Sequence, residues 1–301
     1  MYSGHLKLLV CPVTRKSLEL EALEQKGNEV IRGKLIGREV RTSYSINDGI
    51  PDLVYPQSLY SLDKEFNEKY SSNAAHYDEG MDWLFASFFE EEEEVRTKLV
   101  SLLELKPSQS VLNLGCGTGS DSAIIKRTLN EKGKLFNLDL TSGLLKVAKH
   151  KLGSSSKNQE YIRANGAYLP FGDNTFDSVF HFGGINMFAE KKKSIQEMAR
   201  VTRPGGHVVF GDESAAPWLR NKAYGKIITN ANPLYKQNPP LHLLPENAEK
   251  VSLHYLLGNS FYAISFIVGE EPQLNLDLPI PGKRGGTLRS RYEGHQHNPR
   301  S

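Results

Sequence analysis

The fold is decided by the stretch Val111-Leu112-Asn113-Leu114-Gly115-Cys116-Gly117-Thr118-Gly119. Apolar residues and one amide run directly into three alternating glycines, and Ser120-Asp121 then opens a helical stretch. This pattern is typical of a buried parallel strand that turns sharply into a helix. Glycines remove the Cβ where the backbone passes close to a ligand or adopts a positive φ. We therefore expect the free amides of the turn and of the helix N-terminus to face a bound cofactor.

The composition is that of an ordinary globular protein, with 24% charged and 39% hydrophobic residues. The formal net charge of the 301 residues is only +2, which does not indicate a general electrostatic attraction to nucleic acid. Cys11 and Cys116 provide no disulfide framework. No stretch approaches the roughly 18 apolar residues of a membrane span, and residues 1–10 make a poor signal peptide. The simplest interpretation is a cytoplasmic enzyme or binding protein.

Residues 1–55 predict a small β-rich domain, because short alternating runs are separated by glycine-containing turns. Residues 56–106 predict a helical linker or lid. Phe66, Tyr70 and Tyr77 recur there at helical spacing. These side chains could pack in the core.

Residues 107–269 predict an α/β domain in which strands alternate with helices. We expect strands at 111–115, 134–139, 161–163, 176–182, 207–211, 251–257 and 261–268. We expect helices at 120–130, 142–152 and 190–201. This arrangement is a Rossmann-like, doubly wound, seven-stranded and mostly parallel sheet. The hairpin-type turn at Gly258-Asn259 predicts that the last strand is antiparallel.

Two further segments complete the predicted organisation. Residues 214–250 predict a mostly helical insertion into the α/β domain. Residues 270–301 predict a C-terminal tail that is flexible or docked. The tail carries a basic patch, for which a contact to a phosphate or an anionic substrate is the alternative interpretation. The patch consists of Lys283, Arg284, Arg289 and Arg291.

Asp139 ends the second predicted strand, twenty positions beyond Gly119. Adjacent parallel strands place this carboxylate beside the glycine turn, where it can accept hydrogen bonds from both ribose hydroxyls of a nucleoside. The alternative role is that of a helix N-cap. A dinucleotide would need the longer G-x-G-x-x-G turn for its pyrophosphate, whereas the spacing here is Gly115-x-Gly117-x-Gly119.

Three further motifs follow the glycine turn. They are the segment Asn165-Gly166-Ala167-Tyr168-Leu169-Pro170-Phe171-Gly172-Asp173-Asn174-Thr175-Phe176-Asp177, the segment Phe180-His181-Phe182-Gly183-Gly184, and the segment Ala199-Arg200-Val201-Thr202-Arg203-Pro204-Gly205-Gly206. Together with the turn, they cover about residues 105–212. The sequence resembles the class I S-adenosylmethionine-dependent methyltransferases, specifically the branch that includes the ubiquinone/menaquinone methyltransferases.

The resemblance implies that S-adenosylmethionine is the cofactor and that no metal takes part. By position, Asp139 binds the ribose and Leu140 packs on the adenine. Asn165 stands where this branch usually has Asp as the acceptor for the adenine amino group; an amide oxygen can still accept there. In many relatives a helix at the position of residues 56–106 covers the cofactor, which implies this role for Tyr70 and Tyr77; packing in the core is the alternative. The full set of implied cofactor-contact residues is Gly115, Cys116, Gly117, Gly119, Asp139, Leu140, Asn165, Gly166, Phe182, Gly183 and Tyr77.

The implied reaction is an in-line displacement at the methyl carbon, for which the protein aligns the reactants and excludes water. A base is needed only if the acceptor must lose a proton. His181 is the first candidate for the catalytic base. Asp212, Glu213 and His207 are the next candidates. A packing role is the alternative for His181.

The methyl acceptor is the least specified part of the prediction. The Asp/Asn-Pro-Pro-Tyr/Phe motif of exocyclic-amine methylases is absent after the fourth strand. An apolar, aromatic cover would suit a small-molecule or lipid-like acceptor. The insertion supplies such residues, namely Trp218, Tyr224, Leu234, Tyr235, Leu241, Leu243 and Leu244. Core packing is the alternative interpretation for part of this set. The alternatives are an rRNA or tRNA base methyltransferase and a non-catalytic interaction protein. The oligomeric state is open.

The N-terminal domain carries a second resemblance. Leu9-Val10-Cys11-Pro12 and the segment from Asp48 to Val54 are similar to the zinc-ribbon-like domain of the tRNA-methyltransferase activator family. Metal-binding members of that family have Cys-Pro-x-Cys, but Thr14 stands at the second cysteine position here. A structural zinc site needs four Cys or His ligands. We therefore expect a metal-free module.

Overall fold

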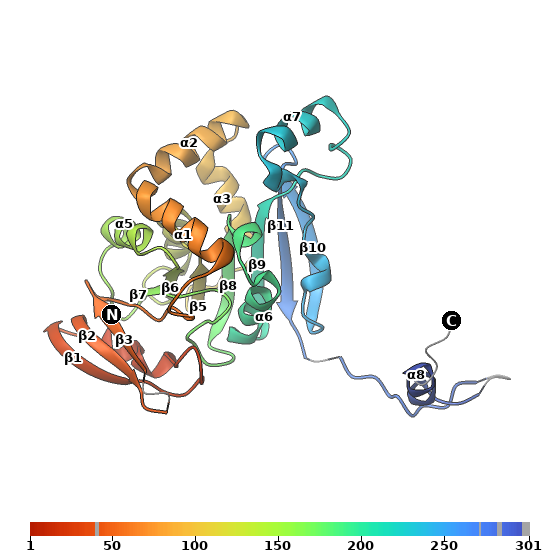
Figure 1. Ribbon diagram of the computed structural model, residues 1–301, viewed down its shortest axis with the longest axis horizontal. Coiled ribbons are helices and arrows are strands. Elements are labelled where there is room, and N and C mark those ends of the chain that lie inside the picture. Colours follow the sequence, from red (N-terminus) through yellow and green to blue (C-terminus); the bar gives the residue numbers. More distant parts are fainter. Residues whose placement is uncertain (40–41, 271, 282–284, 297–301) are drawn as a thin grey trace. The chain divides into compact units, whose positions relative to one another are not determined.

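Seven strands form the central sheet, in the order β10-β11-β9-β8-β5-β6-β7 (Figure 1). The computed structural model describes residues 1–39, 42–270, 272–281 and 285–296. The strands of the central sheet are β5 (Ser110–Leu114), β6 (Lys134–Asp139), β7 (Gln159–Arg163), β8 (Phe176–Phe182), β9 (Thr202–Glu213), β10 (Ala248–Leu256) and β11 (Phe261–Val268).

The directions of these strands confirm the predicted fold. Strands β5 to β9 pair in parallel with one another, and β11 pairs antiparallel with both β9 and β10. The order reverses next to β5, between β6 on one side and β8 on the other. Ligands of open α/β sheets bind at such a switch point, at the carboxyl ends of the strands.

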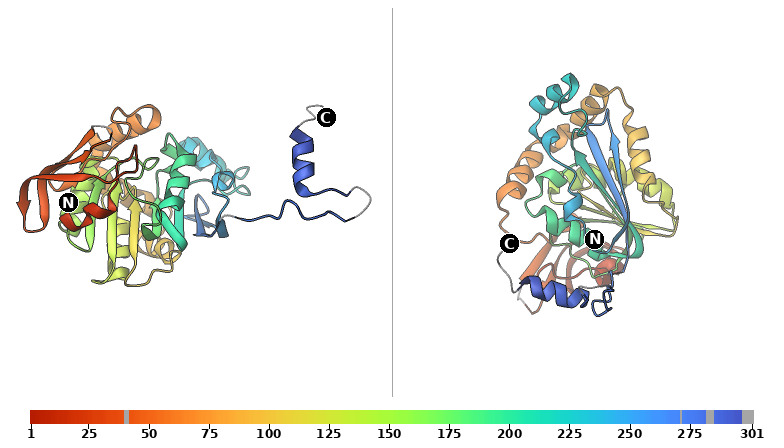
Figure 2. Two further views of the ribbon diagram at one scale, coloured as in Figure 1. Left: turned by 90° about the horizontal axis from the view of Figure 1, so that it is seen from below. Right: turned by 90° about the vertical axis from the view of Figure 1, so that its right-hand side faces the viewer.

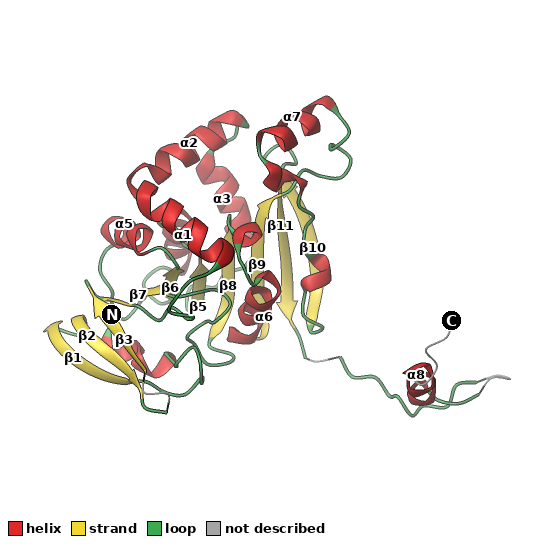
Figure 3. Cartoon of the chain, in the orientation of Figure 1, coloured by secondary structure: helices red, strands yellow, loops and turns green. Residues whose placement is uncertain are grey.

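Helices surround the sheet and cross its carboxyl end (Figure 3). They are α1 (Ser61–Asn73), α2 (Tyr77–Ser87), α3 (Glu92–Ser101), α4 (Ser120–Leu129), α5 (Ser142–Leu152), α6 (Lys191–Val201) and α7 (Ala223–Ala231). The first three occupy the segment that was predicted to be helical, and α4, α5 and α6 lie at the positions predicted for the doubly wound domain.

Side chains of the central strands build a core on each face of the sheet. Successive residues of a strand point to opposite faces. On β9, for example, Val208 and Phe210 belong to a core that includes α6 and the N-terminal residues, whereas Val209 belongs to a core that includes α3 and α4. The two cores support the inner strands from both sides and so hold the carboxyl end of the sheet in place.

The N-terminal residues form a separate, four-stranded antiparallel sheet with the order β1-β2-β3-β4. Its strands are β1 (Glu19–Lys26), β2 (Glu29–Gly37), β3 (Thr42–Asn47) and β4 (Ile50–Pro51), and a 3₁₀ helix, η1 (Ser3–Leu8), precedes them. Cys11 lies buried with its Sγ 3.3 Å from the hydroxyl oxygen of Tyr44.

This small sheet is attached to β7, the edge strand of the central sheet (Figure 2). The N–H of Leu53 donates to the carbonyl of Arg163 at 2.8 Å, and Asp52 forms a parallel bridge with Arg163. The guanidinium of Arg163 also donates to the Asp52 carboxylate at 2.6 Å. The N-terminal sheet therefore covers an edge that would otherwise expose unpaired backbone groups.

Glu160 of β7 is a second anchor for the N-terminal residues. Its side chain is fully buried, at 0% exposure. The backbone N–H groups of Tyr2 and Tyr161 donate to its carboxylate at 2.8 and 3.1 Å, and Nδ1 of His5 lies 3.0 Å from it. The His5 ring in turn packs on Phe136 of the sheet, with ring centroids 4.8 Å apart.

The predicted helical insertion is only partly helical. It contains α7 and two short 3₁₀ helices, Pro233–Lys236 and Leu241–Leu243. Residues 248–250 belong to β10, so the helical prediction is wrong there. These residues pair with β11, and the hydrogen bonds of that ladder override the local sequence pattern.

Residues 1–269 form one unit, and the described residues from 270 onward form a second. In the second unit α8 covers Leu288–Gln296, and Arg289 donates to both carboxylate oxygens of Asp277 at 2.7 and 3.0 Å. Of the predicted basic patch, Lys283 and Arg284 lie outside the described residues. Across the described residues, no helix has both the length and the apolar character needed to cross a bilayer.

Replacing Glu160 tests the anchor between the N-terminal residues and β7. We expect Glu160→Ala to lower the free energy of unfolding by about 3 kcal/mol, because the change leaves several buried donors without an acceptor. Urea unfolding monitored by circular dichroism measures the change. The control is Glu19→Ala, since Glu19 is half exposed and pairs with exposed Arg38; its cost is expected to stay below about 1 kcal/mol. Equal effects of the two substitutions would contradict this role of Glu160.

Candidate functional site

The glycine turn joins β5 to α4 at the carboxyl end of the sheet. Gly115 and Gly119 have positive φ values of 64° and 94°. A Cβ on Gly115 would lie 3.0 Å from Nδ1 of His181, and a Cβ on Gly119 would lie 2.8 Å from Cδ1 of Leu152. Gly115 therefore allows His181 to approach the turn, and Gly119 allows α5 to pack against it.

Asp139, the last residue of β6, holds this turn in place. Its Oδ2 accepts a hydrogen bond from the N–H of Gly117 at 2.9 Å, and its Oδ1 accepts one from the N–H of Thr141 at 2.8 Å. The side chain is only 8% exposed. Burial raises the pKa of the Asp139 carboxyl, and the backbone hydrogen bonds from Thr141 and Gly117 oppose that shift. The acid and the glycine turn are thus in direct contact.

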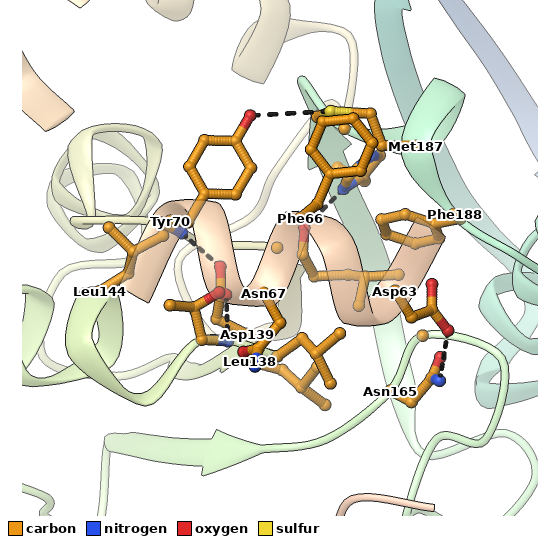
Figure 4. Close-up of a pocket in the computed structure, with 18 of the residues that line it drawn as sticks. Asp63, Phe66, Asn67, Tyr70, Leu138, Asp139, Leu144, Asn165, Met187 and Phe188 are labelled. Carbon is orange, nitrogen blue, oxygen red and sulfur yellow. Dashed lines mark hydrogen bonds between the residues drawn. The ribbon is translucent and has the colours of Figure 1, made fainter. Parts of the chain in front are cut away.

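A cavity opens between the carboxyl ends of the strands and helix α1 (Figure 4). We call it the first cavity. Nine of the predicted site residues line it, namely Tyr77, Gly115, Gly117, Asp139, Leu140, Asn165, Gly166, His181 and Gly183. The apolar side chains of Leu138, Leu144 and Phe188 complete much of its wall.

The other three predicted site residues lie elsewhere. Cys116 and Phe182 line an adjoining hollow, which we call the second cavity, and Tyr70, Tyr77 and Gly183 line both cavities. Gly119 lines neither cavity; it is the N-cap residue of α4. Gly119 therefore contributes through its backbone conformation and through the packing of α5 against the turn.

Asn165 uses both ends of its amide group within the protein. Its Oδ1 accepts a hydrogen bond from the N–H of Ala167 at 2.9 Å, and its Nδ2 donates to Oδ2 of Asp63 at 2.9 Å. The other carboxylate oxygen of Asp63 accepts from the N–H of Ala189 at 3.0 Å. Asp63 belongs to α1, so this pair connects the helix to the loop that follows β7.

His181 of β8 is fully enclosed, at 1% exposure, and its two ring nitrogens differ. Nδ1 lies 2.8 Å from the carbonyl oxygen of Leu114, to which it must donate, whereas Nε2 has no hydrogen-bond partner. This arrangement selects the neutral tautomer with a free lone pair on Nε2. Burial lowers the pKa of His181, and the hydrogen bond to Leu114 opposes the shift.

Aromatic side chains of α1 and α2 form a roof over the first cavity. The rings of Phe66 and Tyr70 stack with centroids 6.2 Å apart, and the ring of Tyr77 meets that of Tyr70 edge-on at 5.8 Å. The hydroxyl of Tyr70 donates to Sδ of Met187 at 3.7 Å (Figure 4). Asp78 ties α2 to the glycine turn and to α5, since its carboxylate accepts hydrogen bonds from Thr118 and Lys151.

The second cavity has a mainly apolar wall. Its apolar lining comes from α2 and the sheet, with Met81, Leu84, Phe85, Phe182, Met187 and Phe261. None of the seven insertion residues that were expected to cover the acceptor lines either cavity. Tyr235 is buried in the core beside α3 and α4, as the alternative interpretation of core packing expects, and Trp218 is exposed. The insertion packs against the last strands instead of over the carboxyl end of β5.

Glu213, at the end of β9, is one of the polar residues that line the second cavity, together with Arg96, Thr118, Ser120 and Asp121. Its Oε2 is buried without a hydrogen-bond partner. Burial and the neighbouring Asp212 raise the pKa of Glu213, which favours the protonated form of its carboxyl group. Arg96, which also lines the second cavity, is paired with Asp121 at 2.8 Å and with Glu92 at 2.5 Å.

Sequence reasoning missed several residues of the first cavity, above all Asp63, Asn67 and Phe188. A single acid or amide on a polar surface helix carries no sequence signal, because only the packing of α1 against the sheet brings it to the cavity. Tyr70 and Tyr77 were detectable from their helical spacing.

The strand order, the antiparallel last strand and the glycine–acid cavity place the chain among the S-adenosylmethionine-dependent methyltransferases. The chain belongs to the ubiE/COQ5 methyltransferase family, whose sequence pattern matches residues 61–233.

Two curated relatives each match a little over a third of the chain. The chain is 37% identical over 114 residues to the ubiquinone/menaquinone biosynthesis C-methyltransferase UbiE of Wigglesworthia glossinidia brevipalpis, a match that covers 37% of this chain and 46% of that protein. It is also 37% identical over 107 residues to the UbiE of Salmonella arizonae, covering 35% and 43% of the two chains. The chain thus spans less than half the length of these curated relatives.

The fold is shared with a chain of the solved complex between the Haloferax volcanii Trm112 methyltransferase activator and a methyltransferase. The TM-score is 0.50 at 12% sequence identity, and the match covers 69% of this chain and 99% of that one.

The protonation state of His181 can be measured directly. We expect the His181 ring to stay neutral as the pH is lowered through the ordinary histidine value of 6.5, because burial disfavours the charged form. The unfolded chain takes up a proton there and the folded chain does not, so this residue also makes the fold less stable as the pH falls through that range. A histidine NMR titration checks this, and His181→Asn identifies the resonance. A titration midpoint at or above 6.5 would contradict the expectation.

Proposed function

We propose that this protein binds S-adenosylmethionine in the first cavity and transfers its methyl group to a carbon atom of a small, mainly apolar acceptor bound in the second cavity. The observation that carries the proposal is the contact between Asp139 and the N–H of Gly117, which places a buried acid beside the glycine turn at the switch point of the sheet. Family membership and the C-methyltransferase names of the relatives support it.

The residues of the first cavity fit this cofactor. Asp139 offers an acceptor for ribose hydroxyls, and Leu138, Leu140 and Leu144 offer an apolar surface for the flat adenine ring. The cofactor residues proposed are those identified from the sequence, with Gly119 acting through the shape of the turn. When bound, S-adenosylmethionine supplies a methyl group already activated by the sulfonium charge.

The protein contributes position and a dry environment. The aromatic roof formed by Phe66, Tyr70 and Tyr77 excludes water from the junction of the two cavities. His181 is proposed as the base that removes a proton from the acceptor, since the residue lines the first cavity and its Nε2 has no hydrogen-bond partner. The alternatives named from the sequence are Asp212, Glu213 and His207, of which Glu213 suits the role of a base least because its pKa is raised.

The acceptor proposed is an aromatic ring of the quinone-precursor kind, as the names of the relatives suggest. The apolar wall of the second cavity suits such a ring. Glu213, in its protonated form, can donate a hydrogen bond to an oxygen substituent of the acceptor. RNA is a less suitable acceptor than a small molecule, because the net charge of the protein is only +2.

The domain organisation proposed is the one read from the sequence, with boundaries at 1–55, 56–106, 107–269 and 270–301. We further propose that residues 1–55 are a metal-free relative of the tRNA-methyltransferase activator domain, on the strength of the motifs around Cys11 and Asp48. Stoichiometric zinc in the purified protein would overturn that assignment.

Cofactor binding can be tested by titration calorimetry with S-adenosylhomocysteine. We expect micromolar binding by the native protein and a loss of about 10- to 100-fold for Asp139→Asn, since the amide cannot accept from both the ribose and the backbone donors. Asp82→Asn is the matched control, because Asp82 is exposed on α2 and makes the same change of charge. Failure of the native protein to bind would overturn the proposed function.

Methyl transfer can be tested with radiolabelled S-adenosylmethionine and a demethylated naphthoquinol that carries a short apolar side chain. We expect label in the ring, and for His181→Asn a rate at least about tenfold lower at every pH. Bulk RNA serves as the competing acceptor. Label in RNA alone would contradict the acceptor class, and an unchanged pH–rate profile in His181→Asn would exclude His181 as the base.

A further inference from the structure

Asp63 is a buried acid without a cationic partner. It is 8% exposed, lies on α1, and lines the first cavity together with Asn165 (Figure 4). Among the described residues, no Lys, Arg or His nitrogen comes within ion-pair distance of its carboxylate. Its contacts are two neutral donors, the N–H of Ala189 at 3.0 Å and Nδ2 of Asn165 at 2.9 Å. A carboxylate has about four acceptor sites, so about two remain for a ligand.

Asn165 cannot supply a carboxylate to the cavity, and its amide oxygen is already engaged. The oxygen accepts from the N–H of Ala167 at 2.9 Å, which fixes the orientation of the amide, and the NH₂ end then points to Asp63. Asp63 is therefore the stronger acceptor at this corner of the cavity, since its carboxylate keeps about two free acceptor sites and the amide oxygen of Asn165 keeps at most one. Burial of a carboxylate is costly unless donors satisfy it, and a donor from the cavity side would complete the set.

We propose that Asp63 accepts a hydrogen bond from the exocyclic amino group of the cofactor's adenine and so selects adenine over purines that carry an oxygen there. This inference rests on the proposed function, because it assumes that the first cavity holds the adenosine group. In this chain the acid of the adenine site lies on helix α1 of the lid, and the strand end carries its amide partner. Asp63 thereby links the recognition of adenine to the position of α1 over the cavity.

The pair predicts the outcome of exchanging its two members. In Asp63→Asn, an NH₂ group replaces a carboxylate oxygen and meets either the NH₂ of Asn165 or the N–H of Ala189, so a donor faces a donor. In the double exchange Asp63→Asn with Asn165→Asp, the new amide on α1 can accept from Ala189 and donate to the new carboxylate at the strand end. That carboxylate can also accept from Ala167. The new amide, the new carboxylate and the two backbone N–H groups then all have hydrogen-bond partners again. The carboxylate now lies at position 165 instead of position 63.

The test compares two ligands that differ at one position of the base. S-adenosylhomocysteine carries the amino group, and S-inosylhomocysteine carries an oxygen in its place. Titration calorimetry on the full-length native protein, on Asp63→Asn and on the double exchange gives the ratio of the two affinities. Glu68→Gln is the matched control, because Glu68 is on α1, is exposed and undergoes the same loss of charge. Thermal unfolding shows whether each variant is folded.

We expect the native protein and Glu68→Gln to prefer S-adenosylhomocysteine by about 10- to 100-fold. Asp63→Asn should lose most of that preference, and the double exchange should recover it. A native protein that binds neither ligand would overturn the proposed function together with this inference. Binding of S-adenosylhomocysteine with no preference over S-inosylhomocysteine, or with an unchanged preference in Asp63→Asn, would overturn the role of Asp63 alone. If Asp63→Asn does not fold, a native protein without the preference, or a folded double exchange without it, would still overturn the role of Asp63.

Discussion

The hydrogen bond from the N–H of Gly117 to the carboxylate of Asp139 is the contact on which the site depends. It joins the tips of β5 and β6, two parallel neighbours whose register is maintained along their whole length. A buried carboxylate is unfavourable unless donors surround it. The backbone of the glycine turn supplies one donor and Thr141 a second, so the same interaction that shapes the turn keeps an acid inside the cavity.

The sheet beneath this contact is held in place by two cores, whereas the cover above it is held mainly by polar contacts. The sheet is packed on both faces, and its exposed edge at β7 is protected by the N-terminal sheet through Asp52 and Arg163. Helices α1 and α2 bury few apolar side chains. They are fastened by Asp63 and Asp78 and by the contact of Tyr70 with Met187. Such an arrangement fits a lid that must open for a cofactor and close over it.

Much of this architecture could be predicted from the sequence, because local rules agree with the fold. The glycine turn, the strand that ends at Asp139 and the hairpin at Gly258 each specify their own conformation. The position of His181 followed from the motif around it. The hydrogen bonding of its ring could not be predicted in the same way. The contact of Nδ1 with the carbonyl of Leu114 depends on the packing of β5 against β8.

The parts that could not be predicted depend on contacts between distant segments. Asp63 and Asn165 are more than one hundred positions apart, and nothing in either neighbourhood indicates that they meet. The apolar residues of the insertion suggested a cover for the acceptor, but the same composition serves equally well for packing against β11, as Tyr235 and Phe261 do.

The most direct measurement is a crystal structure of the protein with S-adenosylhomocysteine. The account predicts the adenosine group in the first cavity, the ribose within hydrogen-bond distance of Asp139, and the sulfur at the junction with the second cavity. Ligand bound elsewhere, or an Asp139 side chain turned away from the ribose, would contradict it.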